Sequence, residues 1–142
     1  MTTLADEMKA DALEAQKFSR KHLVMELDFS EASIQELELQ CDSIEYSMRG
    51  GRSSENVDLL TRMWGAYLGE SLRRATGAAW IEDRAAQVRR IGLRDNEVTV
   101  HPHEQVRRRL NGSKADSLLT FFQQARDSFN AQPKAQESGG KR

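Results

Sequence analysis

Two glycines lie four residues apart inside a strongly apolar helical pattern, at Gly65 and Gly69 within residues 64–80 (W-G-A-Y-L-G-E-S-L-R-R-A-T-G-A-A-W). A glycine in a helix interior destabilises the helix by about 1 kcal/mol relative to alanine, so the pair requires a physical reason. Residues four apart share one helix face, and without two Cβ atoms another backbone or a large ring can lie directly on that face. We therefore interpret this stretch as a packing device rather than a reaction centre.

The chain has 142 residues, which suits one domain with a hydrophobic core. We expect residues 1–130 to form this domain and the polar residues 131–142 to form a disordered tail. Apolar runs of only a few residues are too short to span a membrane. The acidic, polar first residues are not typical of a secretory signal, and the single cysteine, Cys41, excludes an internal disulfide. We therefore expect a cytoplasmic protein.

Helical periodicity dominates the first half of the chain. We expect a helix over residues 3–22 and a second one that starts at Asp28 or Ser30, because both can act as an N-cap. A loop with Gly50 and Gly51 ends the second helix, and Ser53 or Ser54 begins a third. The apolar stripe of the second helix consists of Ile34, Leu37, Cys41, Ile44 and Met48, and that of the third of Val57, Leu60, Met63, Trp64, Tyr67, Leu68 and Leu72.

The periodicity changes after residue 77. Residues 79–83, 86–94 and 97–101 are short segments rich in Val, Ile and Trp, and Asp95-Asn96 between the last two is a hairpin signal. We expect a three-stranded antiparallel meander, then a short helix over residues 103–110 and a final helix capped by Ser113. The predicted fold class is α+β: N-terminal helices, the meander and C-terminal helices, with a single layer of helices against the sheet.

Four motifs together resemble an uncharacterised family of small bacterial domains. They are G-A-Y-L-G-E, G-A-A-W, H-P-H-E-Q-V-R-R-R-L-N-G and D-S-L-L-T-F-F, which follow the pattern G-x-Y-x-G-E … G-x-x-W … P-x-x-x-V … N-G … D-S-L. The resemblance covers residues 27–129 and implies an α+β domain of bacterial origin, without a known activity or ligand. The residues that we regard as its structural signature are Gly65, Tyr67, Gly69, Glu70, Trp80 and Pro102.

Four side chains have chemistry that a catalytic or metal site could use. Glu70 follows the second glycine and could act as a general acid or base, but we favour a structural ion pair with Arg73 or Arg90. His101 and His103 flank a proline without a third metal ligand nearby in the sequence, so we expect no metal site. Cys41 lies on an apolar stripe, which favours a core residue over a nucleophile.

Arginines are concentrated in the second half of the chain, although the formal net charge is only −1. The candidate partner-binding residues are Arg89, Arg90, Arg107, Arg108 and Arg109. Their guanidinium groups suit phosphate, but no aromatic residue is interleaved for base stacking and the sequence pI is about 6.3. We expect residues 106–110 to form an amphipathic turn whose arginine face is either solvated or meets an acidic protein partner.

Phosphate-binding loops, nucleophile elbows and dinucleotide fingerprints are missing from the sequence. We therefore predict a non-catalytic protein-binding module without a cofactor, most concretely an immunity-type or inhibitor protein that neutralises a partner protein. The first alternative is a nucleic-acid-associated accessory protein that uses the arginines. The second is an uncharacterised enzyme centred on Glu70 and His101. The sequence leaves the oligomeric state open.

Overall fold

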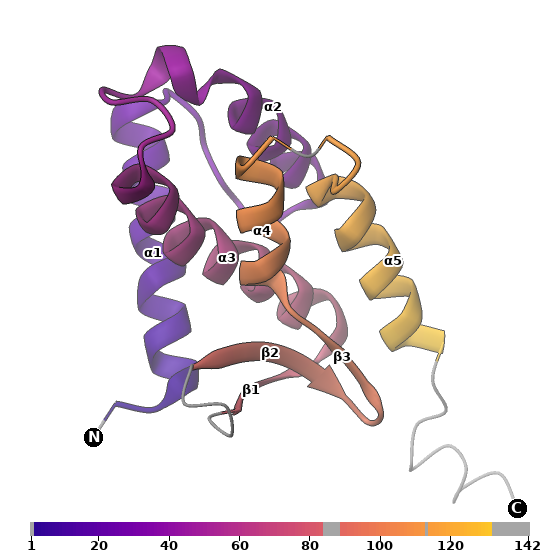
Figure 1. Cartoon of the computed structure of the whole chain (residues 1–142). Helices are drawn as coiled ribbons and strands as arrows, with labels where there is room; N and C mark the ends of the chain where they lie inside the picture. Colours follow the sequence, from indigo (N-terminus) through magenta and orange to yellow (C-terminus); the bar gives the residue numbers. More distant parts are fainter. Residues whose placement is uncertain (1, 84–88, 113, 132–142) are drawn as a thin grey trace, which may run out of the picture.

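The structure is a computed structural model of the chain, and it describes residues 2–83, 89–112 and 114–131. Within these ranges three helices are followed by a sheet and two further helices, which confirms the expected α+β class (Figure 1). The elements are α1 (Leu4–His22), α2 (Glu31–Ser47), α3 (Ser54–Thr76), β1 (Ala79–Asp83), β2 (Arg90–Asp95), β3 (Val98–Val100), α4 (Pro102–Leu110) and α5 (Leu118–Ala131). The expected tail lies outside the described residues, except for Ala131.

Helix α3 is the centre of the arrangement. It packs against α1, α4 and α5, while α2 packs against α5 and α4. The small sheet lies below α2, α3 and α4 in Figure 1, and it contacts α1, α4 and α5. The first turns of α2 and α3 are fixed by the hydroxyls of Ser30 and Ser53, which accept backbone N–H groups.

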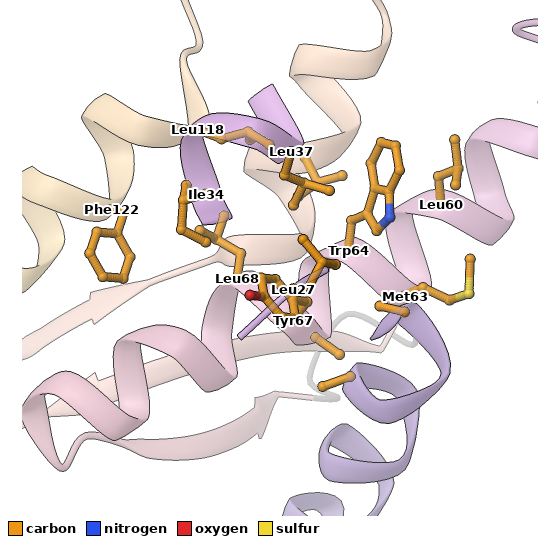
Figure 2. Packing of buried hydrophobic residues seen from close by; sticks show 14 of the residues in the cluster. Leu27, Ile34, Leu37, Leu60, Met63, Trp64, Tyr67, Leu68, Leu118 and Phe122 are labelled. Atoms are coloured by element: carbon orange, nitrogen blue, oxygen red, sulfur yellow. The ribbon is translucent and has the colours of Figure 1, made fainter. Parts of the chain in front are cut away.

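The hydrophobic core is built around the apolar stripe of α3. Trp64 and Tyr67 are its largest fully buried side chains, and Figure 2 shows them facing Ile34 and Leu37 of α2. The stripes predicted for both helices are buried, apart from Met48, which is partly buried. Burial on this scale supplies most of the favourable free energy of folding.

The sheet is the expected meander, with β2 paired antiparallel to both β1 and β3. Asn96 adopts a left-handed backbone with φ 56° in the β2–β3 turn, which confirms the hairpin signal. Strand β1 has the predicted bounds, whereas the bounds of β2 and β3 differ from the prediction. Strand β2 begins at Arg90 rather than residue 86, and residues 84–88 lie outside the described part of the chain. Strand β3 ends at Val100 because Pro102 opens α4 directly afterwards.

The starts of the last two helices differ from the prediction. Helix α4 begins at Pro102 rather than residue 103, since proline is well suited to the first helical position. Helix α5 begins at Leu118, where the Ser117 hydroxyl accepts the Thr120 N–H at 3.1 Å. The prediction that this helix begins after an N-cap at Ser113 was therefore wrong. Ser113 itself lies outside the described residues.

Candidate functional site

The glycine face of α3 receives two aromatic rings. A Cβ atom at Gly69 would overlap Cζ2 and Cη2 of Trp80, and one at Gly65 would lie 2.8 Å from the Cα of His103. The two ring centroids are 5.8 Å apart. The steric interpretation of the two glycines is therefore confirmed, because β1 and α4 both approach α3 where it has no side chain.

Glu70 is buried beside this contact and forms the predicted ion pair with Arg73. Its Oε2 accepts the Trp80 Nε1–H at 2.7 Å and the Arg73 Nε–H at 2.9 Å, and Oε1 accepts Arg73 Nη2 at 3.0 Å. Burial raises the pKa of Glu70, but the hydrogen bonds from Arg73 and Trp80 outweigh it, and the net pKa is lowered. The carboxylate is held ionised and links α3 to β1.

Tyr67 and Pro102 have structural roles. The Tyr67 hydroxyl accepts the backbone N–H of Phe29 at 2.6 Å and shares a hydrogen bond with Ser33 at 2.5 Å, while its ring stacks on Phe29. Phe29 has φ 68°, so Tyr67 stabilises a left-handed residue at the entry to α2. Pro102 is buried at the start of α4.

Each of the five candidate arginines pairs with a carboxylate of the same chain. The pairs are Arg89 with Glu7 and Glu82, Arg90 with Glu104, Arg107 with Asp58, Arg108 with Asp116, and Arg109 with Glu38 and Asp42. Arg89, Arg90 and Arg107 line one pocket, which Arg108 and Arg109 do not line. The residues predicted as one binding face are therefore divided between different surroundings.

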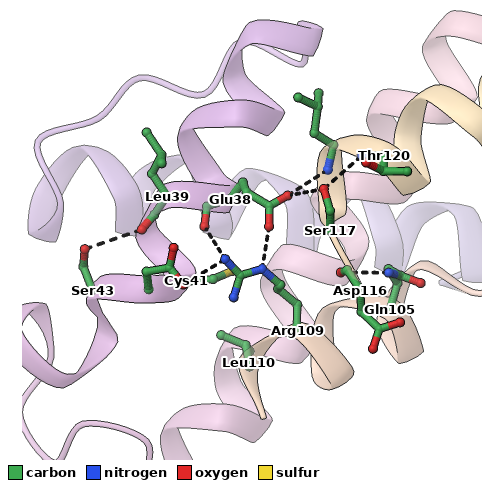
Figure 3. Close-up of polar contacts among 12 residues, drawn as sticks. Glu38, Leu39, Cys41, Ser43, Gln105, Arg109, Leu110, Asp116, Ser117 and Thr120 are labelled. Carbon is green, nitrogen blue, oxygen red and sulfur yellow. Dashed lines mark hydrogen bonds and ion pairs between the residues drawn. The ribbon is translucent and has the colours of Figure 1, made fainter. Parts of the chain in front are cut away.

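Arg109 corrects the prediction of a solvated arginine face. Its side chain is only 4% exposed, because it lies between α4 and α2 (Figure 3). Its Nε donates to Glu38 at 2.5 Å and its Nη2 to Asp42 at 2.9 Å. Glu38 Oε1 also accepts the Ser117 hydroxyl and the Leu119 N–H, so one carboxylate joins α2, α4 and the first turn of α5.

A pocket of about 380 Å³ lies between α3, β2 and α4, and we call it the α3–α4 pocket. It is lined by Thr61, Arg89, Arg90, Ile91, His103, Glu104 and Arg107. The Thr61 hydroxyl and both ring nitrogens of His103 are buried, and they have no hydrogen-bond partner among the described residues. This combination of cationic and unsatisfied polar groups makes the pocket a candidate ligand site.

A second hollow lies where α1 and α2 end side by side (Figure 1). It measures about 240 Å³ and is lined by Phe18, His22, Ser47, Met48 and Arg49. Two hydrophobic residues next to it in the sequence are almost fully exposed: Val24 (93%) and Tyr46 (92%). We call the seven residues together the α1–α2 end. Its exposed aromatic and aliphatic side chains beside an apolar hollow are typical of a protein-binding surface.

Val24 also has an unusual backbone. Its φ of 51° lies in the left-handed region, which is rare for a residue branched at Cβ. Such strain is retained where the surrounding structure enforces it, and it is concentrated at binding and catalytic sites. At Val24 the strained backbone holds an apolar side chain in solvent at the α1–α2 end.

The other candidate residues have ordinary structural surroundings. Burial raises the pKa of the Cys41 thiol to about 12, so a nucleophilic thiolate is disfavoured. His101 Nδ1 lies 3.2 Å from the carbonyl oxygen of Ile91. Among the described residues, no group of three His, Cys, Asp or Glu side chains is placed to hold a metal ion.

His103 predicts a pH dependence of stability. Burial and the neighbouring Arg89 lower its pKa from 6.5 to about 4, although Glu7 and Glu104 act in the opposite direction. The folded state therefore binds fewer protons than the unfolded state between these values, and stability falls as the pH falls. We expect a loss of about 2 kcal/mol between pH 7.5 and pH 5 from this group.

Urea unfolding at the two pH values measures this loss. The variant His103→Gln should lose less stability over the same interval, and an NMR titration of the imidazole should place its midpoint near pH 4. A midpoint near 6.5 in the folded protein would contradict the assignment. This pH interval lies above 4.5, the ordinary pKa of glutamate. Protonation of carboxylates such as Glu70 therefore contributes little to the loss of stability over the interval.

Sequence reasoning missed Thr61, Val24 and Tyr46. Tyr46 carried a usable signal, because it lies off the apolar stripe of an otherwise well-patterned helix, where a large aromatic side chain has no place in the core. Thr61 and Val24 carried no such signal in the sequence. Whether a hydroxyl lacks a hydrogen-bond partner, and whether a valine adopts a left-handed backbone, both depend on tertiary packing.

Within the described ranges, no helix is both long and apolar enough to cross a bilayer. No protein-family model, no curated protein and no solved structure matches the chain.

Proposed function

We propose that the protein is a non-catalytic module that binds another protein, in the manner of an immunity-type inhibitor, through its α1–α2 end. The observation that carries the proposal is the nearly complete exposure of Val24 and Tyr46 beside a 240 Å³ hollow. Interfaces are enriched in tyrosine and methionine, and a few apolar anchors provide most of the binding free energy. A hollow of this size accommodates one large apolar side chain of a partner.

The charges around the α1–α2 end favour an acidic partner segment. Lys21 and Arg49 are exposed and have no ion-pair partner among the described residues, whereas Arg20 is paired with Glu26. An incoming carboxylate would meet available cations here, in contrast to the five arginines that already have carboxylate partners. We therefore expect the partner to present an apolar side chain flanked by acidic residues.

The two alternatives, a nucleic-acid-associated protein and an enzyme, receive less support than protein binding. Nucleic-acid binding requires cations that are free to replace the counterions of phosphates. The candidate arginines do not present one continuous basic face, because Arg109 is buried between α4 and α2 and Arg108 does not line the pocket of Arg89, Arg90 and Arg107. An enzyme centred on Glu70 would need a carboxylate that can exchange protons, but both oxygens of Glu70 accept hydrogen bonds.

Site-specific photo-crosslinking in the source cell tests the proposal. A photoreactive phenylalanine at position 46 should yield a covalent adduct with one protein, whereas the same residue at position 13 should not. Leu13 is a matched control because it is also an exposed hydrophobic residue, on α1. With the purified partner, Tyr46→Ala should then weaken binding about tenfold or more, while Leu13→Ala leaves the Kd unchanged.

Two results would contradict the proposal. Equal adducts from positions 46 and 13 would show that the α1–α2 end is not a specific surface. Micromolar binding of RNA or DNA at about 0.15 M salt, lost in Arg107→Glu, would instead support the nucleic-acid alternative.

A further inference from the structure

The side chains that line the α3–α4 pocket take no part in the protein binding proposed for the α1–α2 end. Its volume of about 380 Å³ is at the lower end of the range typical of small-molecule sites. Ile91 contributes an apolar wall, Thr61 and His103 contribute polar groups, and three arginines contribute cations. Small-molecule sites typically combine an apolar surface with a few convergent polar groups, which orient the ligand.

Two side chains of the pocket lining, Thr61 and His103, contain buried polar atoms without a hydrogen-bond partner among the described residues. Thr61 is 7% exposed, and its hydroxyl has no partner among the described residues, nor have the two ring nitrogens of His103. A buried polar group without a hydrogen bond destabilises the protein by about 1–3 kcal/mol. A hydroxyl and a neutral imidazole can each both donate and accept, so they suit a ligand that carries hydroxyl groups.

Three of the lining side chains are arginines, and each is paired with at least one carboxylate. Arg90 is paired with Glu104, which also lines the pocket, whereas the partners of Arg89 (Glu7 and Glu82) and of Arg107 (Asp58) do not line it. All three arginine side chains are partly exposed. Ion pairs between such side chains contribute only about 0–1 kcal/mol each, so a ligand can exchange them at little cost.

We propose that the α3–α4 pocket binds a small phosphomonoester, with its phosphate between the guanidinium groups of Arg89, Arg90 and Arg107 and its hydroxyl-bearing body toward Thr61 and His103. The planar guanidinium fork matches two phosphate oxygens at once, and three forks around one pocket can satisfy a dianion. Ile91 covers the apolar part of the ligand. The proposal is independent of the protein-binding surface.

Calorimetric titration of the full chain with adenosine monophosphate and with glucose 6-phosphate tests the proposal and distinguishes a nucleotide from a sugar phosphate. We expect saturable binding of at least one of them at pH 7.5. Thr61→Val and Arg90→Gln should each weaken it about tenfold, as expected for a hydrogen bond to a charged or orienting group. Arg108→Gln is the matched control, since Arg108 does not line the pocket.

Thr61→Val also has a readout that does not depend on the ligand. Because the hydroxyl has no hydrogen-bond partner among the described residues, its replacement by a methyl group of similar shape should leave the melting temperature unchanged or raise it. The proposal is overturned if neither phosphomonoester binds, if Arg90→Gln binds as tightly as the wild type, or if succinate binds as tightly as the phosphates. Tyr46→Ala should leave phosphate binding intact, which separates this result from the test of protein binding.

Discussion

Replacing Gly69 with leucine is expected to lower the free energy of unfolding by about 3 kcal/mol or more. A Cβ atom at this position overlaps the Trp80 ring, and the remaining leucine atoms have no space on this face of α3. The ring cannot move aside freely, because its Nε1–H is donated to the buried Glu70 carboxylate at 2.7 Å. Either the β1 strand separates from α3, or Glu70 loses a hydrogen bond while it remains buried.

Chemical denaturation of Gly69→Leu and of related variants measures this effect. Ala75→Leu is the matched control, because Ala75 lies on the exposed face of the same helix and should change stability by less than about 0.5 kcal/mol. The smaller change Gly69→Ala should also destabilise the protein, and part of that loss should be recovered in a Trp80→Leu background. A melting temperature of Gly69→Leu within about a degree of the wild type would disprove the close contact.

The sequence was sufficient to predict the reason for the glycine pair but not the identity of both neighbours. A helical glycine face implies a ring or a backbone, and that argument is local. That Trp80 lies on Gly69 follows from the turn after Gly77, whose φ of 85° directs β1 back along α3. That His103 lies on Gly65 depends on where the meander returns the chain, and no local pattern specifies this.

Among the charged residues, too, some contacts could be predicted from the sequence and others could not. The ion pair of Glu70 with Arg73 was predictable, because the two residues are three apart on one helix. The burial of Arg109 could also have been predicted from the sequence. Arg109 and Leu110 follow Val106 by three and four positions, which places Arg109 on the apolar side of α4. The partner carboxylates Glu38 and Asp42 were not predictable, since they come from α2, about 70 residues away.

The start of α5 was mispredicted because local capping signals are degenerate. Ser113 and Ser117 both precede apolar residues at helical spacing. Glu38 of α2 distinguishes them by accepting hydrogen bonds from Ser117 and the Leu119 N–H. The choice between two equivalent caps was therefore made by a tertiary contact.

Arg109 leads to the second large expected effect: Arg109→Ala should destabilise the protein by about 3 kcal/mol or more. Removing the guanidinium group leaves Glu38 and Asp42 of α2 without their shared cation. Figure 3 shows Arg109 and Glu38 at this junction of α2 and α4. Burial raises the pKa of Glu38, but hydrogen bonds from Leu119, Arg109 and Ser117 outweigh it, and the net pKa is lowered. The stabilisation is therefore present at neutral pH and is lost as the pH falls below the ordinary glutamate value of 4.5.

Arg107→Ala on the same helix is the matched control for Arg109→Ala. The Arg107 side chain is 47% exposed and pairs with an exposed Asp58, so its removal should change the free energy of unfolding by no more than about 1 kcal/mol. In the double variant Arg109→Met with Glu38→Gln, part of the lost stability should return, because no uncompensated carboxylate remains at position 38. Equal stabilities of Arg109→Ala and Arg107→Ala in urea unfolding at pH 7 would show that Arg109 belongs to the solvated face after all. A large difference would establish that Arg109 holds α2 against α4, whereas Arg107, which lines the α3–α4 pocket, contributes little to stability.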